Sequence, residues 1–336
     1  SRLQSLRRQI ASLESAGRPA HGVLPFGDAR IDAHLPGGGL ARGAWHTLTS
    51  DGLELETGAA AGSFAALLAK QKAAHLRDGA PSAEARIDRL DRCIRILVDN
   101  REAIEEALNT DFGSRSREAT AFTDISASIG PLKHAKENLR AWMKTEKRKP
   151  SPAILGLFGA KAEVRFQPKG VVGVISPWNF PVNLTFAPLA GIIAAGNRAM
   201  IKPSEFTPVT SELMKTMFAS AFSEEEIAVV TGGPEVGQAF ASLAFDHMIF
   251  TGATSIARHV MRAAAENLVP LTLELGGKSP TIVGRSADLD LTVEKIAMGR
   301  VQNGGQICVM PDTVYLPRER VEAFVNKFRA LWLTLF

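Results

Sequence analysis

The chain has 336 residues, of which 45% are hydrophobic and 22% are charged, a composition typical of a globular protein with a sizeable core. Its 39 basic and 35 acidic residues leave a net charge of only +4. The two basic runs, 114–117 and 144–149, resemble solvated loops, so we expect no nucleic-acid partner. No apolar run reaches the length of a membrane span or forms a signal-peptide core, and we expect a cytoplasmic protein without a membrane partner. Two distant cysteines and the lack of a CxxC or HExxH pattern indicate neither a disulfide framework nor a metal site.

The first 69 residues differ in texture from the rest, and we expect them to form a loosely packed N-terminal extension. Apolar residues at positions 3, 6, 10 and 13 have the spacing of a short amphipathic helix. A segment rich in glycine and proline follows over 24–40, and small apolar residues predict a second helix over 59–69.

Helical periodicity begins at Ser82 and predicts helical structure that ends near Gly113. A further helix is expected over 129–143. The basic stretch 144–152 contains proline and is expected to be a linker, and 164–166 is expected to be a short strand.

From Gly170 onward, short apolar runs alternate with helical segments. The predicted strands are 170–176, 199–201, 227–230, 247–250 and 271–275, and the predicted helices between them are 186–195, 208–222, 236–244 and 254–267. This rhythm predicts a parallel sheet covered by helices on both faces. Such a sheet binds its ligand in the loops at the carboxyl ends of its strands.

Polar residues and glycines gather where these strands end. In chain order they are Ser176 to Pro181, Lys202 to Glu205, Gly232 to Pro234, Thr251 with Gly252, and Glu274 to Lys278. Five successive strand ends of this kind are hard to attribute to packing, and they predict a binding site.

Cys308 lies among glycines and amides, in a run that begins at Gln302, and is poor core material but a plausible nucleophile. Glu274 precedes it at the opening of a glycine turn. A thiol attacks carbonyl carbons, and a carboxylate activates the water that removes the acyl group. The other cysteine, Cys93, lies in a charged helical stretch and is expected to be structural.

Four motifs in this order resemble the NAD(P)-dependent aldehyde dehydrogenase superfamily, and most of all its coniferyl aldehyde dehydrogenase branch. They are Asp111-Phe112-Gly113-Ser114-Arg115-Ser116, Ile201-Lys202-Pro203-Ser204-Glu205, Leu273-Glu274-Leu275-Gly276-Gly277-Lys278-Ser279-Pro280 and Gly305-Gln306-Ile307-Cys308-Val309. The resemblance runs from about residue 69 to residue 328. It implies an α/β fold with a Rossmann-type parallel sheet and a second, incomplete α/β catalytic domain. The implied divisions are an extension over 1–69, an NAD(P)-binding domain with N-terminal helices over 70–275, and a partial catalytic domain over 276–336.

The resemblance implies an enzyme that oxidises an aromatic or medium-chain aldehyde to the acid. Cys308 would be the nucleophile, and Asn179 would donate its amide to the oxyanion together with the backbone N–H of Cys308. Glu274 would activate the water that hydrolyses the thioester.

The cofactor implied by the resemblance is NAD, with NADP as an alternative. Lys202 and Glu205 would hold the adenosine ribose, where a carboxylate suits a 2′-hydroxyl and repels a 2′-phosphate. The remaining implied cofactor residues are Trp178, Ser204, Gly233, Thr251, Gly252 and Gly276.

The chain departs from the family pattern at several places. Ala257 stands where glycine is usual, and an added methyl there would crowd the helix or the cofactor; Gly305 in place of alanine is a milder change. The chain stops at Phe336, so we expect the catalytic domain to be truncated and the segment that pairs subunits in this oligomeric family to be missing. The apolar run 331–336 does not resemble the family.

About 65 residues at the beginning resemble ImuA-like proteins, which are RecA relatives linked to DNA-damage mutagenesis. A P-loop should follow, but Gly58 to Phe64 has one residue too few between its glycines and no lysine, so we expect no ATP site. Two alternatives to an enzyme stay open. The expected truncation motivates a non-catalytic protein that binds the cofactor or a partner. The first 65 residues motivate a DNA-damage-associated protein, although the lack of a P-loop argues against it.

Overall fold

The computed structural model describes residues 23–24, 40–41 and 53–335, and it divides into two compact units, Ser1–Ala59 and Ala60–Phe336. In the first unit, β1 (Val23–Leu24) pairs antiparallel with β2 (Leu40–Ala41). The helix predicted near residues 3–13 and most of the ImuA-like segment lie outside the described residues.

Helix α3 (Leu53–Asp78) is continuous through residue 69, where we expected the N-terminal extension to end. In the second unit it is held to the sheet by the buried amide of Gln71, which donates to the carbonyls of Ala199 and Glu224 at 3.0 and 2.7 Å. The helix predicted over 59–69 is thus part of a longer one, and the threefold division at residues 69 and 275 stays a prediction.

A helical layer follows, and its ends have local causes. The Ser82 hydroxyl accepts a hydrogen bond from the Ala85 N–H and begins the first helix, and Gly113 ends the second in a left-handed conformation at φ +79°. Both ends were predicted. The elements are α4 (Ala83–Asp99), α5 (Arg101–Phe112), α6 (Arg117–Thr120), the π-helix η2 (Ala121–Ser126) and α7 (Ala127–Trp142).

The prediction of a linker over 144–152 is wrong in part, because residues 146–148 of this stretch form a strand. β3 (Glu146–Arg148) pairs antiparallel with β4 (Ala162–Val164), and the 3-10 helix η3 (Ala153–Phe158) lies between them. The strand expected over 164–166 is displaced toward the N-terminus. Backbone hydrogen bonds hold the charged residues of β3 in a strand, although the sequence there has no hydrophobic alternation.

The predicted parallel sheet is confirmed, with strand order β7-β6-β5-β8-β9 and every pairing parallel. Its strands are β5 (Val171–Ile175), β6 (Arg198–Lys202), β7 (Ile227–Val229), β8 (His247–Gly252) and β9 (Leu271–Leu275). The connecting helices are α8 (Asn183–Ala194), α9 (Pro208–Ala221), α10 (Pro234–Ala241) and α11 (Thr254–Ala265).

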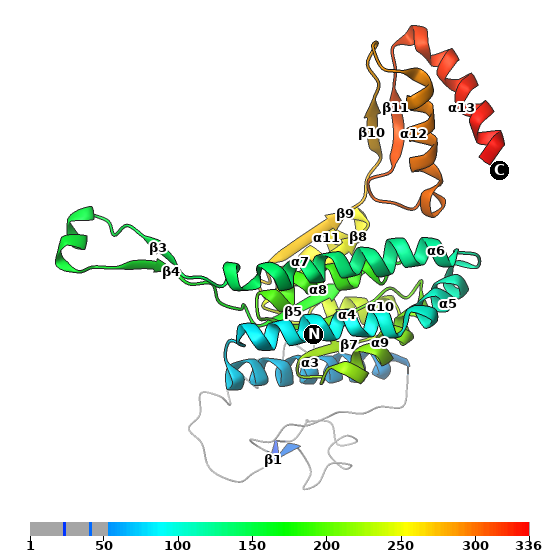
Figure 1. Ribbon diagram of the computed structural model, residues 1–336. Helices are drawn as coiled ribbons and strands as arrows, with labels where there is room; N and C mark the ends of the chain where they lie inside the picture. Colours follow the sequence, from blue (N-terminus) through cyan, green and yellow to red (C-terminus); the bar gives the residue numbers. More distant parts are fainter. Residues whose placement is uncertain (1–22, 25–39, 42–52, 336) are drawn as a thin grey trace. The chain divides into compact units, whose positions relative to one another are not determined.

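Figure 1 shows the helices and strands of the second unit. Two apolar clusters pack helices against the sheet. The larger joins α4, α7, α8 and α9 to the sheet and includes the stacked rings of Phe186 and Phe218, with centroids 4.9 Å apart. The second joins α10 and α11 to the sheet, together with Leu68 of α3. Burial on both sides explains the apolar runs in the central strands β5 and β6, whereas the edge strand β9 alternates half-buried and exposed residues.

A smaller group of elements completes the second unit. β10 (Ser279–Ile282) pairs parallel with β11 (Pro311–Tyr315), and their apolar cluster includes residues of the helices α12 (Leu289–Val301) and α13 (Val321–Leu335). No helix in residues 53–335 is long and apolar enough to cross a membrane.

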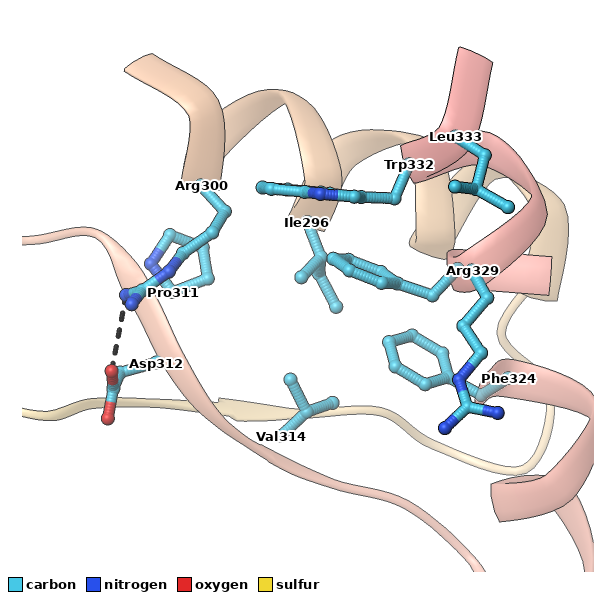
Figure 2. Close-up of a pocket in the computed structure, with 10 residues that line it drawn as sticks. Ile296, Arg300, Pro311, Asp312, Val314, Phe324, Arg329, Trp332 and Leu333 are labelled. Carbon is cyan, nitrogen blue, oxygen red and sulfur yellow. Dashed lines mark hydrogen bonds and ion pairs between the residues drawn. The ribbon is translucent and has the colours of Figure 1, made fainter. Parts of the chain in front are cut away.

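Figure 2 shows a groove of about 560 Å³ in this group, between Ile296 of α12, Val314 of β11 and Phe324 of α13. At one end of it the Arg300 guanidinium pairs with Asp312 at 3.2 Å. None of the site residues predicted from the sequence lines this groove.

Candidate active site

The sheet order determines where a ligand site forms. The chain adds β6 and β7 on one side of β5 and then returns to add β8 on its other side. Such a reversal opens a crevice at the carboxyl ends of β5 and β8. Three predicted site segments lie at these ends and at the end of β9: the loop after β5, Thr251 with Gly252 in the last residues of β8, and Glu274 in β9.

The loop after β5 brings Asn179 to the cysteine-bearing segment. The Asn179 side-chain amide donates to the carbonyl of Gln306 at 2.9 Å, and Gln306 lies two residues before Cys308. The Asn179 carbonyl accepts from Arg115 Nη1 and from the amide of Asn303, each at 3.1 Å. Asn179 is therefore held both through its side chain and through its backbone.

The segment before Cys308 makes a tight left-handed bend. Asn303, Gly304 and Gly305 have φ values of +48°, +60° and +82°. We expected Gly305 to be a mild replacement for alanine, but its positive φ disfavours any residue with a Cβ. A Cβ at this position would lie 3.3 Å from the sulfur of Met310.

Cys308 is exposed and follows Ile307 in a turn closed by a hydrogen bond from the Met310 N–H to the Ile307 carbonyl at 3.3 Å. The Cys308 carbonyl accepts from the Ser279 hydroxyl at 3.4 Å, so the turn also touches β10. Within residues 53–335 the Cys308 N–H has no hydrogen-bond acceptor, which leaves it free to bind an oxyanion.

Glu274 lies near the end of β9, opposite Thr251 of β8, and its side chain is exposed. It makes no hydrogen bond or ion pair with Cys308 among residues 53–335. A Cβ built on nearby Gly276 would meet nothing within 4 Å, so open space lies beside this strand end.

Lys202 and Glu205 come together at the end of β6, where the buried Lys202 ammonium donates to Glu205 at 2.8 Å. Burial raises the pKa of the Glu205 carboxyl, but the hydrogen bond and the charge of Lys202 outweigh it, and the pKa lies below its ordinary value. The Glu205 carboxylate is therefore charged at neutral pH.

Ser204 is buried and has a structural role in the same turn. Its hydroxyl accepts from the Phe206 N–H at 3.2 Å, and its carbonyl accepts from the Ser211 hydroxyl at 2.9 Å. These bonds shape the loop that carries Glu205 and begins α9.

Glycines and an uncapped helix end lie at the remaining strand ends. A Cβ on Gly233, at the start of α10, would lie 2.7 Å from the Glu235 carboxylate, and one on Gly252 would lie 2.7 Å from the Phe250 ring. Ala253 precedes α11 and supplies no side-chain cap, so N–H groups of its first turn are open to an anion.

Two other positions complete the predicted set. Trp178 is 38% exposed, and its ring centroid lies 6.3 Å from that of Phe112. We expected the methyl of Ala257 to crowd the helix, but it is buried in the apolar cluster between α11 and the sheet and fills space there.

The sequence interpretation missed a buried ion pair. Arg115 was expected in a solvated loop, but its side chain is only 4% exposed and pairs at 2.6 Å with Asp124, which is fully buried. Burial lowers the pKa of the guanidinium and raises that of the carboxyl, so each charge depends on the other. The motif 111–116 could have indicated that Arg115 is important. Nothing in the sequence indicated that Asp124, in the π-helix η2, is its partner.

Comparison with known proteins places the chain in the family that its sequence motifs resemble. The family described as "Aldehyde dehydrogenase family" matches residues 57–335, which is wider than the 69–328 expected and includes most of the apolar run 331–336. The chain is 69% identical over 264 residues to a "Probable coniferyl aldehyde dehydrogenase" of Caulobacter vibrioides, covering 79% of this chain and 54% of that one. It is 53% identical over 259 residues to a "Coniferyl aldehyde dehydrogenase" of a Pseudomonas species, covering 77% and 53%.

Solved structures agree in fold. A substrate-bound AldH of Staphylococcus aureus matches with a TM-score of 0.76 at 34% identity, covering 80% of this chain and 58% of that one. A Mycobacterium tuberculosis aldehyde dehydrogenase complexed with NAD+ matches with a TM-score of 0.72 at 30% identity, covering 81% and 55%. The chain spans about half the length of the curated relatives it matches. The family match over residues 57–335 and the similarity to these relatives show that the chain belongs to the aldehyde dehydrogenase family.

Proposed function

We propose that this chain carries the site at which an NAD(P)-dependent enzyme oxidises an aldehyde to the carboxylic acid. The names of its relatives point to coniferyl aldehyde or a similar aromatic aldehyde, with medium-chain aldehydes as the wider class. The observation that carries the proposal is the hydrogen bond from Asn179 to Gln306, since it joins the loop of an oxyanion donor to the loop of an exposed thiol.

In the proposed reaction the Cys308 sulfur attacks the aldehyde carbon as the carbonyl electron pair moves to oxygen, which gives a thiohemiacetal. The Cys308 N–H has no other acceptor in the described chain, and the Asn179 amide has a second N–H beyond the one given to Gln306. Both are available to the oxyanion, and aligned donors of this kind supply much of the catalysis in acyl transfer.

Glu274 is proposed as the base of the second stage. Its exposed carboxylate would take a proton from water, the hydroxide would attack the thioester carbon, and the Cys308 thiolate would leave. Within residues 53–335 the Glu274 side chain makes no hydrogen bond or ion pair with Cys308, and the proposed mechanism links the two through a water molecule.

The residues at the strand ends fit a dinucleotide. Lys202 holds a charged Glu205 carboxylate that can accept from ribose hydroxyls, and the uncapped start of α11 can bind a phosphate. Gly276 leaves open space where a side chain would stand. Trp178, Ser204, Gly233, Thr251 and Gly252 are the other proposed cofactor residues. The chemistry that a bound NAD+ supplies is acceptance of hydride from the thiohemiacetal carbon. NAD is the proposed form because the carboxylate of Glu205 repels a 2′-phosphate.

The proposal is tested by incubating the chain with coniferyl aldehyde and NAD+ and following NADH absorbance. Cys308→Ala should abolish turnover, whereas Cys93→Ala should retain it, because Cys93 is buried away from the site. Equal NADH formation by the wild-type and Cys308→Ala chains would refute the proposal.

Because the chain spans about half the length of its relatives, cofactor binding is measured separately from turnover. Quenching of tryptophan fluorescence on titration with NAD+, without any NADH formation, would favour a non-catalytic cofactor-binding chain. The expected cytoplasmic location stays a prediction, and sedimentation of the purified chain measures its oligomeric state.

A further inference from the structure

The Arg115–Asp124 ion pair lies beneath the loop that carries Asn179. Asp124 belongs to the π-helix η2, and helical irregularities of this kind are frequent at functional sites. The guanidinium carbon of Arg115 lies over two phenylalanine rings, 4.8 Å from the Phe112 centroid and 5.2 Å from that of Phe180. The guanidinium therefore has one well-defined orientation.

The groups bound by this pair belong to one short segment. Arg115 Nη1 donates to the Asn179 carbonyl at 3.1 Å. One carboxylate oxygen of Asp124 accepts from the N–H groups of Val182 and Asn183, each at 3.1 Å, and the other accepts from Arg115. The pair thus holds both ends of the loop from Asn179 to Asn183.

We propose that Arg115 and Asp124 are positioning residues that hold the Asn179 amide where the oxyanion forms. This inference rests on the proposed function, since Asn179 has no oxyanion to bind unless Cys308 attacks an aldehyde. Burying two charges costs free energy that a well-packed apolar pair would not cost. Unlike an apolar pair, the two buried charges bind three backbone groups of this loop: the Asn179 carbonyl and the N–H groups of Val182 and Asn183.

Arg115→Lys is the informative substitution, because it keeps the positive charge and loses the fork that reaches both Asp124 and Asn179. We expect kcat to fall by about tenfold to 100-fold, approaching the effect of losing one oxyanion donor, while the KM for NAD+ changes less than about twofold. Asp124→Asn should have a similar effect on kcat.

A double substitution separates positioning from general destabilisation. Because Arg115 acts through Asn179, Arg115→Lys should reduce kcat less than about threefold further when Asn179 is already alanine. Full additivity of the two effects, or wild-type kcat in Arg115→Lys, would overturn the proposal.

The matched control is Arg86→Lys. Arg86 is also a buried arginine, but it donates to the carbonyls of Pro81 and Ala194, remote from the Asn179 loop. We expect Arg86→Lys to lower the melting temperature without lowering kcat.

Hydrogen–deuterium exchange tests the positioning even if the chain shows no turnover. Backbone amides of residues 179–184 should exchange faster in Arg115→Lys than in the wild type, and at the wild-type rate in Arg86→Lys. Absent turnover in the wild type would refute the proposed function alone, whereas unchanged exchange in Arg115→Lys would refute the positioning role.

Discussion

The Asn179 amide donates to the Gln306 carbonyl across 2.9 Å and joins two loops that are 127 residues apart in the sequence. One loop follows the central strand of the sheet, and the other leads into the turn of Cys308. The bond uses one of the two N–H groups of the amide. It orients the side chain before any substrate arrives and leaves the second N–H for the substrate oxygen.

Replacement of Asn179 by alanine should therefore act on the chemical step. We expect kcat to fall by about 100-fold to 1,000-fold, with little change in the Kd for NAD+, because the lost donor acts on charge that develops in the transition state. Steady-state kinetics together with fluorescence titration would measure the two effects. A loss confined to NAD+ affinity would contradict the assignment.

The two cysteines should differ sharply in reactivity. Cys308 is exposed, whereas burial raises the pKa of the Cys93 thiol far above its ordinary value. Iodoacetamide at neutral pH should alkylate Cys308 alone in the folded protein, and both cysteines in denaturant. Peptide mass spectrometry gives the site, and rapid alkylation of Cys93 without denaturant would contradict its buried position.

Gly305→Ala should destabilise the protein by about 1 kcal/mol or more, because φ is +82° and an added methyl would lie close to Met310. The matched control is Gly130→Ala in α7, where a Cβ meets nothing within 4 Å and alanine is the better helix former. Chemical denaturation of both variants tests the difference. Equal midpoints would show that the bend before Cys308 does not need its glycine.

Stability at acid pH should depend on Glu226, which lies between Arg89 and Arg92 of α4 at about 3 Å. Burial raises the pKa of the Glu226 carboxyl, but the two arginines lower it by more than burial raises it. The pKa in the folded protein therefore lies below the ordinary value of 4.5. The stabilisation is therefore complete above pH 4.5 and is lost as the pH falls through the folded pKa.

Glu226→Gln should lower the free energy of unfolding by about 1–3 kcal/mol at pH 7 and flatten its decline below pH 4.5. Glu212→Gln, which removes an exposed carboxylate of α9, serves as the control and should change neither quantity. Urea denaturation at several pH values measures both. Parallel pH profiles for wild type and Glu226→Gln would contradict the lowered pKa.

Glu205→Gln should change the choice of cofactor. Removal of the charge that Lys202 holds at the end of β6 should weaken NAD+ and strengthen NADP+, so the ratio of their Kd values shifts toward NADP+. Glu266→Gln, at the exposed end of α11, is the control. An unchanged ratio would show that Glu205 does not face the 2′ position.

The sequence predicted the parallel sheet well because the central strands β5 and β6 are buried along almost their whole length and contain short apolar runs. The edge strand β9 instead alternates half-buried and exposed residues. The β3–β4 pair was predicted only in part, because a strand was expected over 164–166 and lies at Ala162–Val164. β3 was missed because its three residues are charged and its pairing with β4 depends on backbone hydrogen bonds. Arg115 was assigned to a solvated loop because a charged side chain is buried only where a partner meets it. That partner, Asp124, lies in a π-helix without a sequence signature.

For the candidate site, the sequence could indicate residues but not the contacts between distant parts of the chain. Motifs predict which residues belong together, and the structure adds the hydrogen bonds of the predicted site residues Asn179, Lys202 and Glu205. The hydrogen bond from the Asn303 amide to the Asn179 carbonyl depends on the left-handed bend at residues 303–305. That bend could not be predicted from the amino-acid composition of the segment.

The central place of β5 in the sheet also has a consequence for the order in which the protein is assembled during synthesis. β5, β6 and β7 are neighbours both in the chain and in space, so they can pair as soon as they are made. β8 pairs with β5 only after that half exists, and β9 pairs with β8 in turn. Lys202 and Glu205 are thus in place on a nascent half-sheet, whereas Thr251 and Glu274 arrive with its last strands. The nascent chain therefore acquires Glu205, the carboxylate proposed to bind the dinucleotide, before Glu274, the acid proposed to activate the hydrolytic water.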